Sequence, residues 1–129
     1  MKKASENCLK IAERDLRAAK SLLKANDSLN TIFHLHAAVE KILKGIAEER
    51  GNNPPKIHAL KKLAVDVCQL KLETHVEILI KSLDKAFLDS RYPEDIEIFE
   101  EEYDNEYCQQ LVKDVEVTFK WLRDLLTQN

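Results

Sequence analysis

The sequence predicts an all-α protein, an up-and-down bundle of about five helices that forms one domain over residues 1–129. Two glycines and three prolines are too few for the closely spaced turns of a strand-rich fold. Charged residues make up 33% of the chain and hydrophobic residues 44%, with Leu, Lys, Glu and Ala prominent, which is typical of amphipathic helices. Along most of the chain the apolar residues recur at spacings of three and four, the period of one helix face.

The first three helices are expected over about 5–25, 28–50 and 58–69. Ser5 is a candidate N-cap for the first of them. Gly51 suits the position just after the second helix, and the two prolines that follow prevent its continuation. The second helix is apolar around much of its circumference, so we expect it to lie at the centre and to touch several neighbours. Its apolar residues are Ile32, Phe33, Leu35, Ala38, Val39, Ile42, Leu43 and Ile46.

The last two helices are separated by an acidic stretch. The fourth helix is expected to begin at Thr74, where Thr74 and Glu77 have the spacing of a capping box. It should stop before Pro93, because a proline disfavours helical geometry in the residue before it. Acidic residues dominate positions 93–103, which we interpret as a loop. Asp104 is then the expected N-cap of the last helix.

Charge and cysteine content exclude several classes of protein. The net charge of −3 and the isoelectric point of about 5.8 lack the basic excess of a general nucleic-acid binder, although a local basic patch is compatible with them. Cys8, Cys68 and Cys108 form no C-x-x-C pair and are odd in number, which indicates reduced thiols in a cytoplasmic protein. No apolar stretch follows the N-terminal lysines, and none elsewhere approaches the ~18 residues of a membrane span. We therefore expect neither a signal peptide nor a membrane helix.

Three segments stand in an order that resembles a known family. They are HLHAAVEKILK at 34–44, PPKIHALKKL at 54–63 and LDSRYP at 88–93. The set resembles the HEPN family, named for "higher eukaryotes and prokaryotes nucleotide-binding", with its A-x-E-K-x-L-K helix, its proline loop leading into H-x-L-x-x-L, and its S-R-Y-P motif. The resemblance covers nearly the whole chain.

The resemblance implies a five-helix bundle that forms a homodimer in a bacterial or archaeal cell. It also implies a minimal nucleotidyltransferase as partner in a toxin–antitoxin-like pair, and it implies neither metal nor cofactor. Many HEPN proteins are metal-independent ribonucleases in which a histidine follows an arginine after four to six residues. Here no histidine follows Arg91, and seven residues lie between Arg50 and His58. The chain thus resembles the RYP type without the ribonuclease motif, and catalysis is not expected.

Arg91 and Tyr92 are the first candidate site residues. A guanidinium holds phosphate through two parallel hydrogen bonds, and a tyrosine ring can stack on a base. The alternative is structural: Arg91 would pair with Asp89, Glu94 or Asp95, and Tyr92 would pack at the helix end.

Four further candidates for nucleotide or RNA binding lie on the second helix and the turn after it. His58 is a candidate base or ligand-contacting donor, and the alternative is that it caps a helix or orients the loop. His36, Glu40 and Lys44 are spaced i, i+4, i+8 and form one row. Two ligands are too few for a metal site, so we interpret this row as a solvated or dimer-facing ladder.

Three functions fit these residues. The favoured one is a non-catalytic homodimer that binds a nucleotide or RNA and acts with a minimal nucleotidyltransferase. The second is a ribonuclease toxin, with Arg91 on the phosphate and His58 or His36 as acid–base. The third is a structural dimeric adaptor. The homodimer is expected from the resemblance and from apolar residues beyond one core seam, Trp121 and Leu125 among them.

Overall fold

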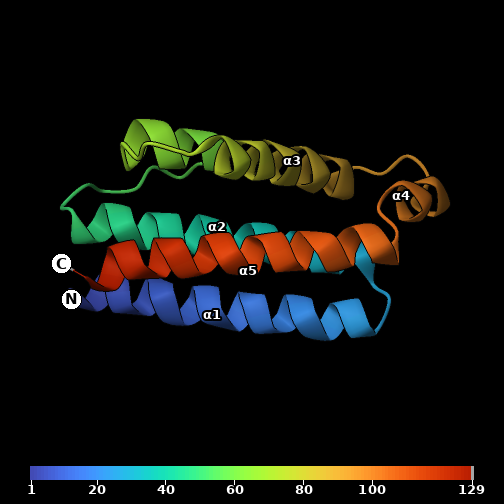
Figure 1. Cartoon of the computed structure of the whole chain (residues 1–129), viewed down its shortest axis with the longest axis horizontal. Helices are drawn as coiled ribbons and strands as arrows, with labels where there is room; N and C mark the ends of the chain where they lie inside the picture. The colour runs from blue at the N-terminus through green and yellow to red at the C-terminus, as the bar shows by residue number, and fades with distance from the viewer. Residues whose placement is uncertain (129) are drawn as a thin grey trace.

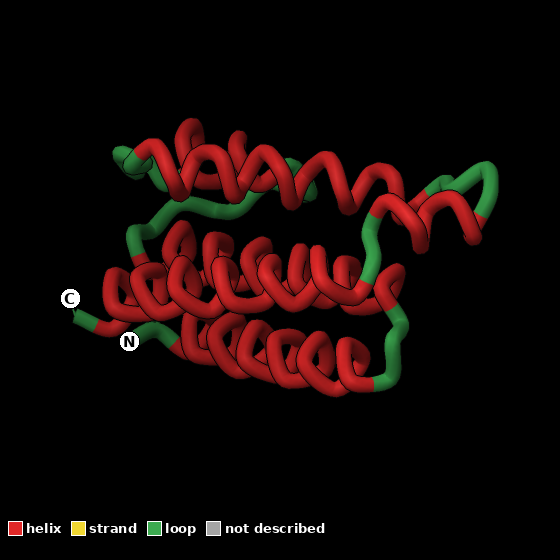
Figure 2. Tube along the Cα trace, turned by 45° about the vertical axis from the view of Figure 1, so that its right-hand side comes forward, coloured by secondary structure: helices red, strands yellow, loops and turns green. Residues whose placement is uncertain are grey.

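The computed structural model describes residues 1–128, which contain helices and no strand. The elements are α1 (Lys3–Lys24), α2 (Ser28–Glu49), a π-helical segment η1 (Lys62–Val67), α3 (Thr74–Arg91), α4 (Ile96–Glu102) and α5 (Asn105–Thr127). In Figure 1, α1, α2 and α5 lie alongside one another, α3 runs along one side of them, and the short α4 sits at one end. The all-α bundle predicted from the sequence is confirmed, and the turned view of Figure 2 shows only helices and loops.

The central position predicted for α2 is also confirmed. It packs against every other element, and Ile32, Leu35, Ile42 and Leu43 on it are completely buried. Phe33 differs from the predicted inward set, because 42% of it is exposed. Several polar side chains of α2 are buried as well, among them Thr31, His36 and Glu40.

Gly45 lies where α1 and α2 come closest. A Cβ added at this glycine would lie 3.1 Å from Cβ of Cys8 and 3.6 Å from the carbonyl oxygen of Ser5. The missing side chain thus permits the close approach of the two helices.

The helix starts agree only in part with the predicted caps. Ser5 is not an N-cap, because α1 begins two residues earlier and the Ser5 side chain is buried inside the first turns. Thr74 is the first residue of α3, but Glu73 occupies the cap position and makes no side-chain bond there, so the predicted capping box does not form. Asp104 is confirmed as N-cap of α5, since its carboxylate accepts the N–H of Tyr107 at 2.8 Å.

The prediction of a loop over 93–103 is wrong, because α4 forms within it. Asp95 caps this helix by accepting the N–H groups of Glu97 at 2.9 Å and Ile98 at 3.2 Å. Phe99 and Tyr103, one turn apart, are 5% and 3% exposed and fix α4 to the bundle. Two apolar anchors on one face thus hold a helix whose other side chains are acidic or, like Ile98, apolar and exposed.

The helix predicted over 58–69 is shorter than expected. Helical geometry begins at Leu60, and in η1 the N–H of Cys68 donates to the carbonyl of Leu63, five residues back, at 2.9 Å. Arg50 fixes this end, since its guanidinium donates to the carbonyl of Cys68 at 2.6 Å. Arg50 therefore has a structural partner in the described chain.

Other sequence expectations concern the surface and the thiols. Trp121 and Leu125 are partly buried and pack against the core, so they do not project as free apolar groups. All three cysteines are unpaired, and burial raises the pKa of Cys68 and of Cys108 to about 11. No helix within residues 1–128 is both long and apolar enough to cross a membrane.

Candidate functional site

A polar cluster lies between α2, the loop before η1, and α3. His36 of α2 is 1% exposed, and its Nε2 lies 3.0 Å from Oδ1 of Asp84 in α3. Because a carboxylate only accepts, His36 donates through Nε2. Asp84 also accepts the backbone N–H groups of Leu60 at 3.0 Å and Lys61 at 3.3 Å. These groups open a helical segment and have no partner within it, so Asp84 caps that segment from the neighbouring helix.

Glu40, one turn after His36, connects the cluster to Lys44 and His58. It is 6% exposed, and its Oε2 accepts Nζ of Lys44 at 2.9 Å. Its Oε1 lies 3.0 Å from Nδ1 of His58 on the loop. Burial raises the pKa of Glu40, but the bonds from Lys44 and His58 outweigh it and hold the pKa below its ordinary value. Glu40 is therefore an ionised carboxylate with two cationic or donating partners, which is what a buried charge requires.

The row formed by His36, Glu40 and Lys44 is therefore neither a solvated nor a dimer-facing ladder, and that interpretation is wrong. The loop before η1 and α3 cover this flank of α2, so the side chains of His36 and Glu40 are buried and 15% of the Lys44 side chain is exposed. Nδ1 of His36 lies 3.8 Å from Oε1 of Glu40 and has no hydrogen-bond partner within residues 1–128. His34 points elsewhere, and its Nδ1 lies 2.9 Å from Oδ1 of Asp15 in α1.

An aromatic stack connects this cluster to the end of α3. The ring of Phe87 lies parallel to the ring of His36, with centroids 3.8 Å apart and an interplanar angle of 10°. Arg91, one turn further along α3, places Cζ 5.6 Å from the Phe87 centroid and 5.8 Å from the Tyr92 centroid. The guanidinium thus lies within reach of two aromatic faces, a favourable position for a cation.

The ion-pair alternative for Arg91 is not observed. No acidic partner of Arg91 is found in residues 1–128, although Asp89 and Asp95 are close in sequence. Asp89 instead binds Lys85 at 2.8 Å and the hydroxyl of Tyr103 at 2.5 Å. Asp95 is engaged as the cap of α4. Arg91 is exposed, and 78% of Tyr92 is exposed, so neither fills the structural role considered for it.

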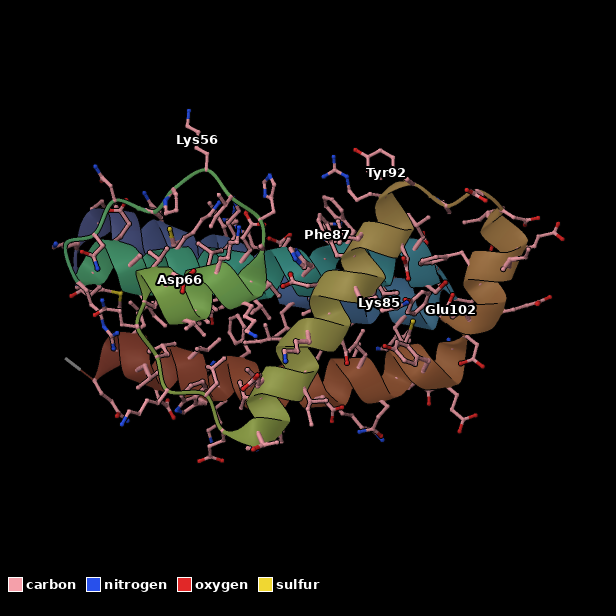
Figure 3. All side chains as sticks on the ribbon, turned by 90° about the horizontal axis from the view of Figure 1, so that it is seen from above. Lys56, Asp66, Lys85, Phe87, Tyr92 and Glu102 are labelled. Atoms are coloured by element: carbon pink, nitrogen blue, oxygen red, sulfur yellow. The ribbon has the colours of Figure 1, made fainter. Side chains whose placement is uncertain are left out.

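The loop before η1 and the end of α3 lie along one edge of the molecule. In Figure 3, Lys56 and Tyr92 project from the same edge, and Phe87 lies on α3 close to it. The side chain of His58, from the same loop as Lys56, is 63% exposed. Its Nδ1 faces Glu40, which leaves Nε2 without a protein partner among the described residues. Lys56, His58, Arg91 and Tyr92 are called the basic edge below.

The basic edge combines cations with an aromatic ring and an imidazole. An arginine and a lysine attract phosphate, and the exposed tyrosine ring can stack on a base. The carboxylate of Glu40 fixes the orientation of the His58 imidazole, as second partners of functional histidines do. Within residues 1–128, no group of three or more His, Cys, Asp or Glu side chains is placed to hold a metal ion.

The sequence candidates divide into two sets in the structure. His58, Arg91 and Tyr92 reach the surface, whereas His36 and Glu40 are buried behind them. Sequence reasoning missed Asp84, which connects α2, α3 and the start of η1. A signal was present, because Asp84 lies four residues after the inward-facing Ile80 and so on the apolar side of α3.

The fold and the cluster define a small all-α domain whose central helix and third helix share a buried polar core beneath a basic edge. A model of the HEPN domain matches residues 5–125, and the chain belongs to the HEPN family. A protein of Methanocaldococcus jannaschii named "Putative toxin MJ1304" is 29% identical over 132 residues, covering 93% of this chain and 86% of that protein. No solved structure gives a significant match to the chain.

Proposed function

We propose that this HEPN protein binds the phosphate and base of a nucleotide or RNA at its basic edge, without cleaving it. The observation that carries the proposal is the exposed Arg91, which has no ion pair in the described chain and stands beside an exposed Tyr92. Of the three neighbouring acids that could neutralise Arg91, Asp89 is engaged by Lys85 and Tyr103, Asp95 caps α4, and Glu94 makes no ion pair with Arg91 in the described chain. The guanidinium is thus available for an external anion.

The buried cluster positions this edge. Asp84 holds His36, His36 stacks on Phe87, and Cζ of Arg91 lies 5.6 Å from the centroid of the Phe87 ring. On the other side, Glu40 holds His58 at the surface. His36, Glu40 and Lys44 accordingly act through neighbours and do not contact the ligand. A preorganised cation loses less conformational entropy when it binds phosphate.

The ribonuclease alternative is favoured by one specific observation, the pairing of Glu40 with His58. An exposed imidazole oriented by a carboxylate can transfer a proton to or from an RNA hydroxyl. His36, the other histidine considered for that role, is buried and cannot reach a substrate. If cleavage occurs, His58 is therefore its acid–base group.

The wider role proposed is that of a toxin-like homodimer that acts with a minimal nucleotidyltransferase. A relative that carries the name of a toxin supports the first part, and the family resemblance supports the partner. Exposed apolar side chains on α3 and α5, Ile78 at 60% and Val117 at 67%, support a further interface. A single sedimenting species of monomer mass at micromolar concentration would contradict the dimer, and calorimetry with the nucleotidyltransferase tests the partner.

Binding is tested by the fluorescence anisotropy of a labelled short RNA, with ATP as competitor. Arg91→Ala is expected to weaken binding about tenfold, the effect of one lost phosphate contact. Arg17→Ala is the matched control, because Arg17 is an exposed arginine on α1, away from the basic edge. Equal losses in the two variants, or no binding by the wild type, would contradict the proposal.

The same RNA, incubated and run on a gel, tests the ribonuclease alternative. Cleavage that is lost in both His58→Ala and Arg91→Ala would establish it and replace the non-catalytic proposal. Intact RNA with the wild type, or equal cleavage by all three proteins, would remove it.

A further inference from the structure

Negative charge is concentrated in one short segment of the chain. Residues 94–106 contain eight Asp and Glu residues and no Lys or Arg. The whole chain has a net charge of −3, so the remaining residues together carry +5. The acidic segment comprises α4, its two flanking turns and the first two residues of α5, at one end of the bundle in Figure 1.

An apolar groove of about 290 Å³ lies between the end of α3 and this acidic helix. Its apolar lining includes Leu88, Tyr92 and Ile98, which are 63%, 78% and 62% exposed. Large apolar side chains that are exposed together in a concave site are a typical sign of an interaction surface. The groove, defined by these residues with Phe99 at its base, is called the α3–α4 groove below.

The walls of the α3–α4 groove are fixed to each other. The hydroxyl of Tyr103 donates to Asp89 of α3 at 2.5 Å, and Lys85 binds the same carboxylate at 2.8 Å. Phe99 is 5% exposed, and its ring centroid lies 4.9 Å from that of Tyr103. Figure 3 shows Lys85 and Glu102 facing each other between α3 and α4. The groove is therefore formed before any partner arrives.

The groove is bordered by carboxylates, which select the charge of its occupant. Asp89, Glu94, Asp95 and Glu102 line it, and no lysine or arginine does. Lys85 of α3 binds Asp89 at 2.8 Å and Glu102 at 3.4 Å, and it is the only cation paired with these four carboxylates in the described chain. An acidic or neutral apolar segment would gain no electrostatic attraction here, whereas a basic one would gain both attraction and apolar contact.

We propose that the α3–α4 groove docks a segment of a partner protein in which apolar side chains are flanked by lysines or arginines. The apolar side chains fill the space between Leu88, Tyr92 and Ile98, and the cations meet Glu94 and Glu102 on the rim. Electrostatic steering by the acidic end of the molecule speeds the encounter.

The docked segment also covers Tyr92. This residue lines the groove and belongs to the basic edge, so an occupied groove hinders base stacking there. This regulatory consequence depends on the proposed function, whereas the docking itself does not. A partner that binds here is thus expected to compete with RNA.

The probe for docking is a fluorescent 14-residue peptide in which leucines recur at spacings of three and four residues and the positions between them are lysines. Its control is a peptide in which every lysine is replaced by glutamate. The lysine peptide is expected to bind the full-length protein, and the glutamate peptide is not. Binding of both with equal affinity, or of neither, overturns the proposal.

Matched variants separate the groove from the overall negative charge. Glu94→Gln with Glu102→Gln removes two rim charges and should weaken the peptide about tenfold, because each lost carboxylate removes part of the electrostatic attraction to the lysines. Glu97→Gln with Glu101→Gln removes two charges of α4 that do not line the groove, and should cost about twofold at most through screened attraction. Equal losses in the two double variants would show diffuse attraction and would overturn the proposal.

Apolar contact is tested in the same way. Ile98→Ser should weaken the peptide, whereas Ile11→Ser, which changes an exposed isoleucine on α1 outside the groove, should not. If Ile98→Ser instead converts a dimer into a monomer in sedimentation, a second copy occupies the groove and the partner proposal is overturned. Peptide binding that survives in Arg91→Ala while RNA binding is lost would separate docking from the proposed nucleotide function.

Discussion

Asp84 is the residue whose removal tests the buried cluster most directly. Its carboxylate accepts from His36 and from the backbone N–H groups of Leu60 and Lys61, so three elements meet at one side chain. We expect Asp84→Ala to destabilise the fold and to loosen the start of the helical segment at Leu60.

The magnitude follows from the groups left without partners. A buried donor that loses its acceptor costs about 1–3 kcal/mol, and Nε2 of His36 would be such a donor. The loss of a side-chain cap costs about 1 kcal/mol more. Because 23% of the Asp84 side chain is exposed, water replaces part of the lost bonding. We therefore expect a decrease of about 3 kcal/mol in the free energy of unfolding. Asp84→Asn keeps one accepting oxygen and should lose about half as much.

The assay is urea unfolding followed by circular dichroism at neutral pH, with hydrogen exchange of the Leu60 and Lys61 amides as a local readout. Both amides should exchange faster in Asp84→Ala. The control is Asp66→Ala, which removes an exposed carboxylate of η1 and should change stability by about 0.5 kcal/mol or less. An unchanged unfolding free energy in Asp84→Ala, or equal losses in Asp84→Ala and Asp66→Ala, would refute the reasoning.

Three further predictions follow from the structure. The folded-state pKa of Glu40 lies below its ordinary value, so its ionised form stabilises the fold at neutral pH, and this contribution is lost as the pH falls below about 4.5. Glu40→Gln should therefore flatten the acid side of a curve of unfolding free energy against pH. An unchanged slope would contradict the buried ion pairs. Burial, and then the bond to Asp89, raises the pKa of Tyr103 to about 12, so the protonated hydroxyl stabilises the fold below about pH 10, and this contribution is lost as the pH rises from there through about 12. Ultraviolet titration of Tyr103→Phe should therefore lack the most alkaline tyrosine transition of the wild type. If that transition remains, it belongs to another tyrosine. Gly45→Ala should lower the melting temperature, although alanine has a helix propensity that is ~1 kcal/mol more favourable than glycine's, because the new methyl group meets Cys8. A higher melting temperature would show that α1 and α2 can move apart without loss of stability.

The secondary structure was largely predictable because the signals for it are local. The apolar period of α2 and the Asp104 cap are properties of consecutive residues, and both were found from the sequence. The prediction failed for α4, where composition suggested a solvated loop. Its helix depends on the packing of Phe99 and Tyr103 against the bundle, and packing between elements is not visible in a short window of sequence.

The site shows the same division. His58, Arg91 and Tyr92 were recognised as candidates because each stands at a helix end in a short motif, and the structure exposes all three. The row of His36, Glu40 and Lys44 was recognised as one face of a helix, but its environment was misjudged. Helical spacing tells which side chains share a face and does not tell what covers that face.

By itself, the sequence determined that this chain forms amphipathic helices around one apolar core. Its motifs also indicated the polar residues on which a function could depend. The tertiary structure alone decided that His36 meets Asp84, 48 positions away, and that Glu40 meets His58. It also decided that Arg91 is left without an acidic partner in the described chain, while Asp89 binds Lys85 and Tyr103 and Asp95 caps α4. The physical reason is that partnership and burial depend on distances between helices, which are set by the packing of the whole core.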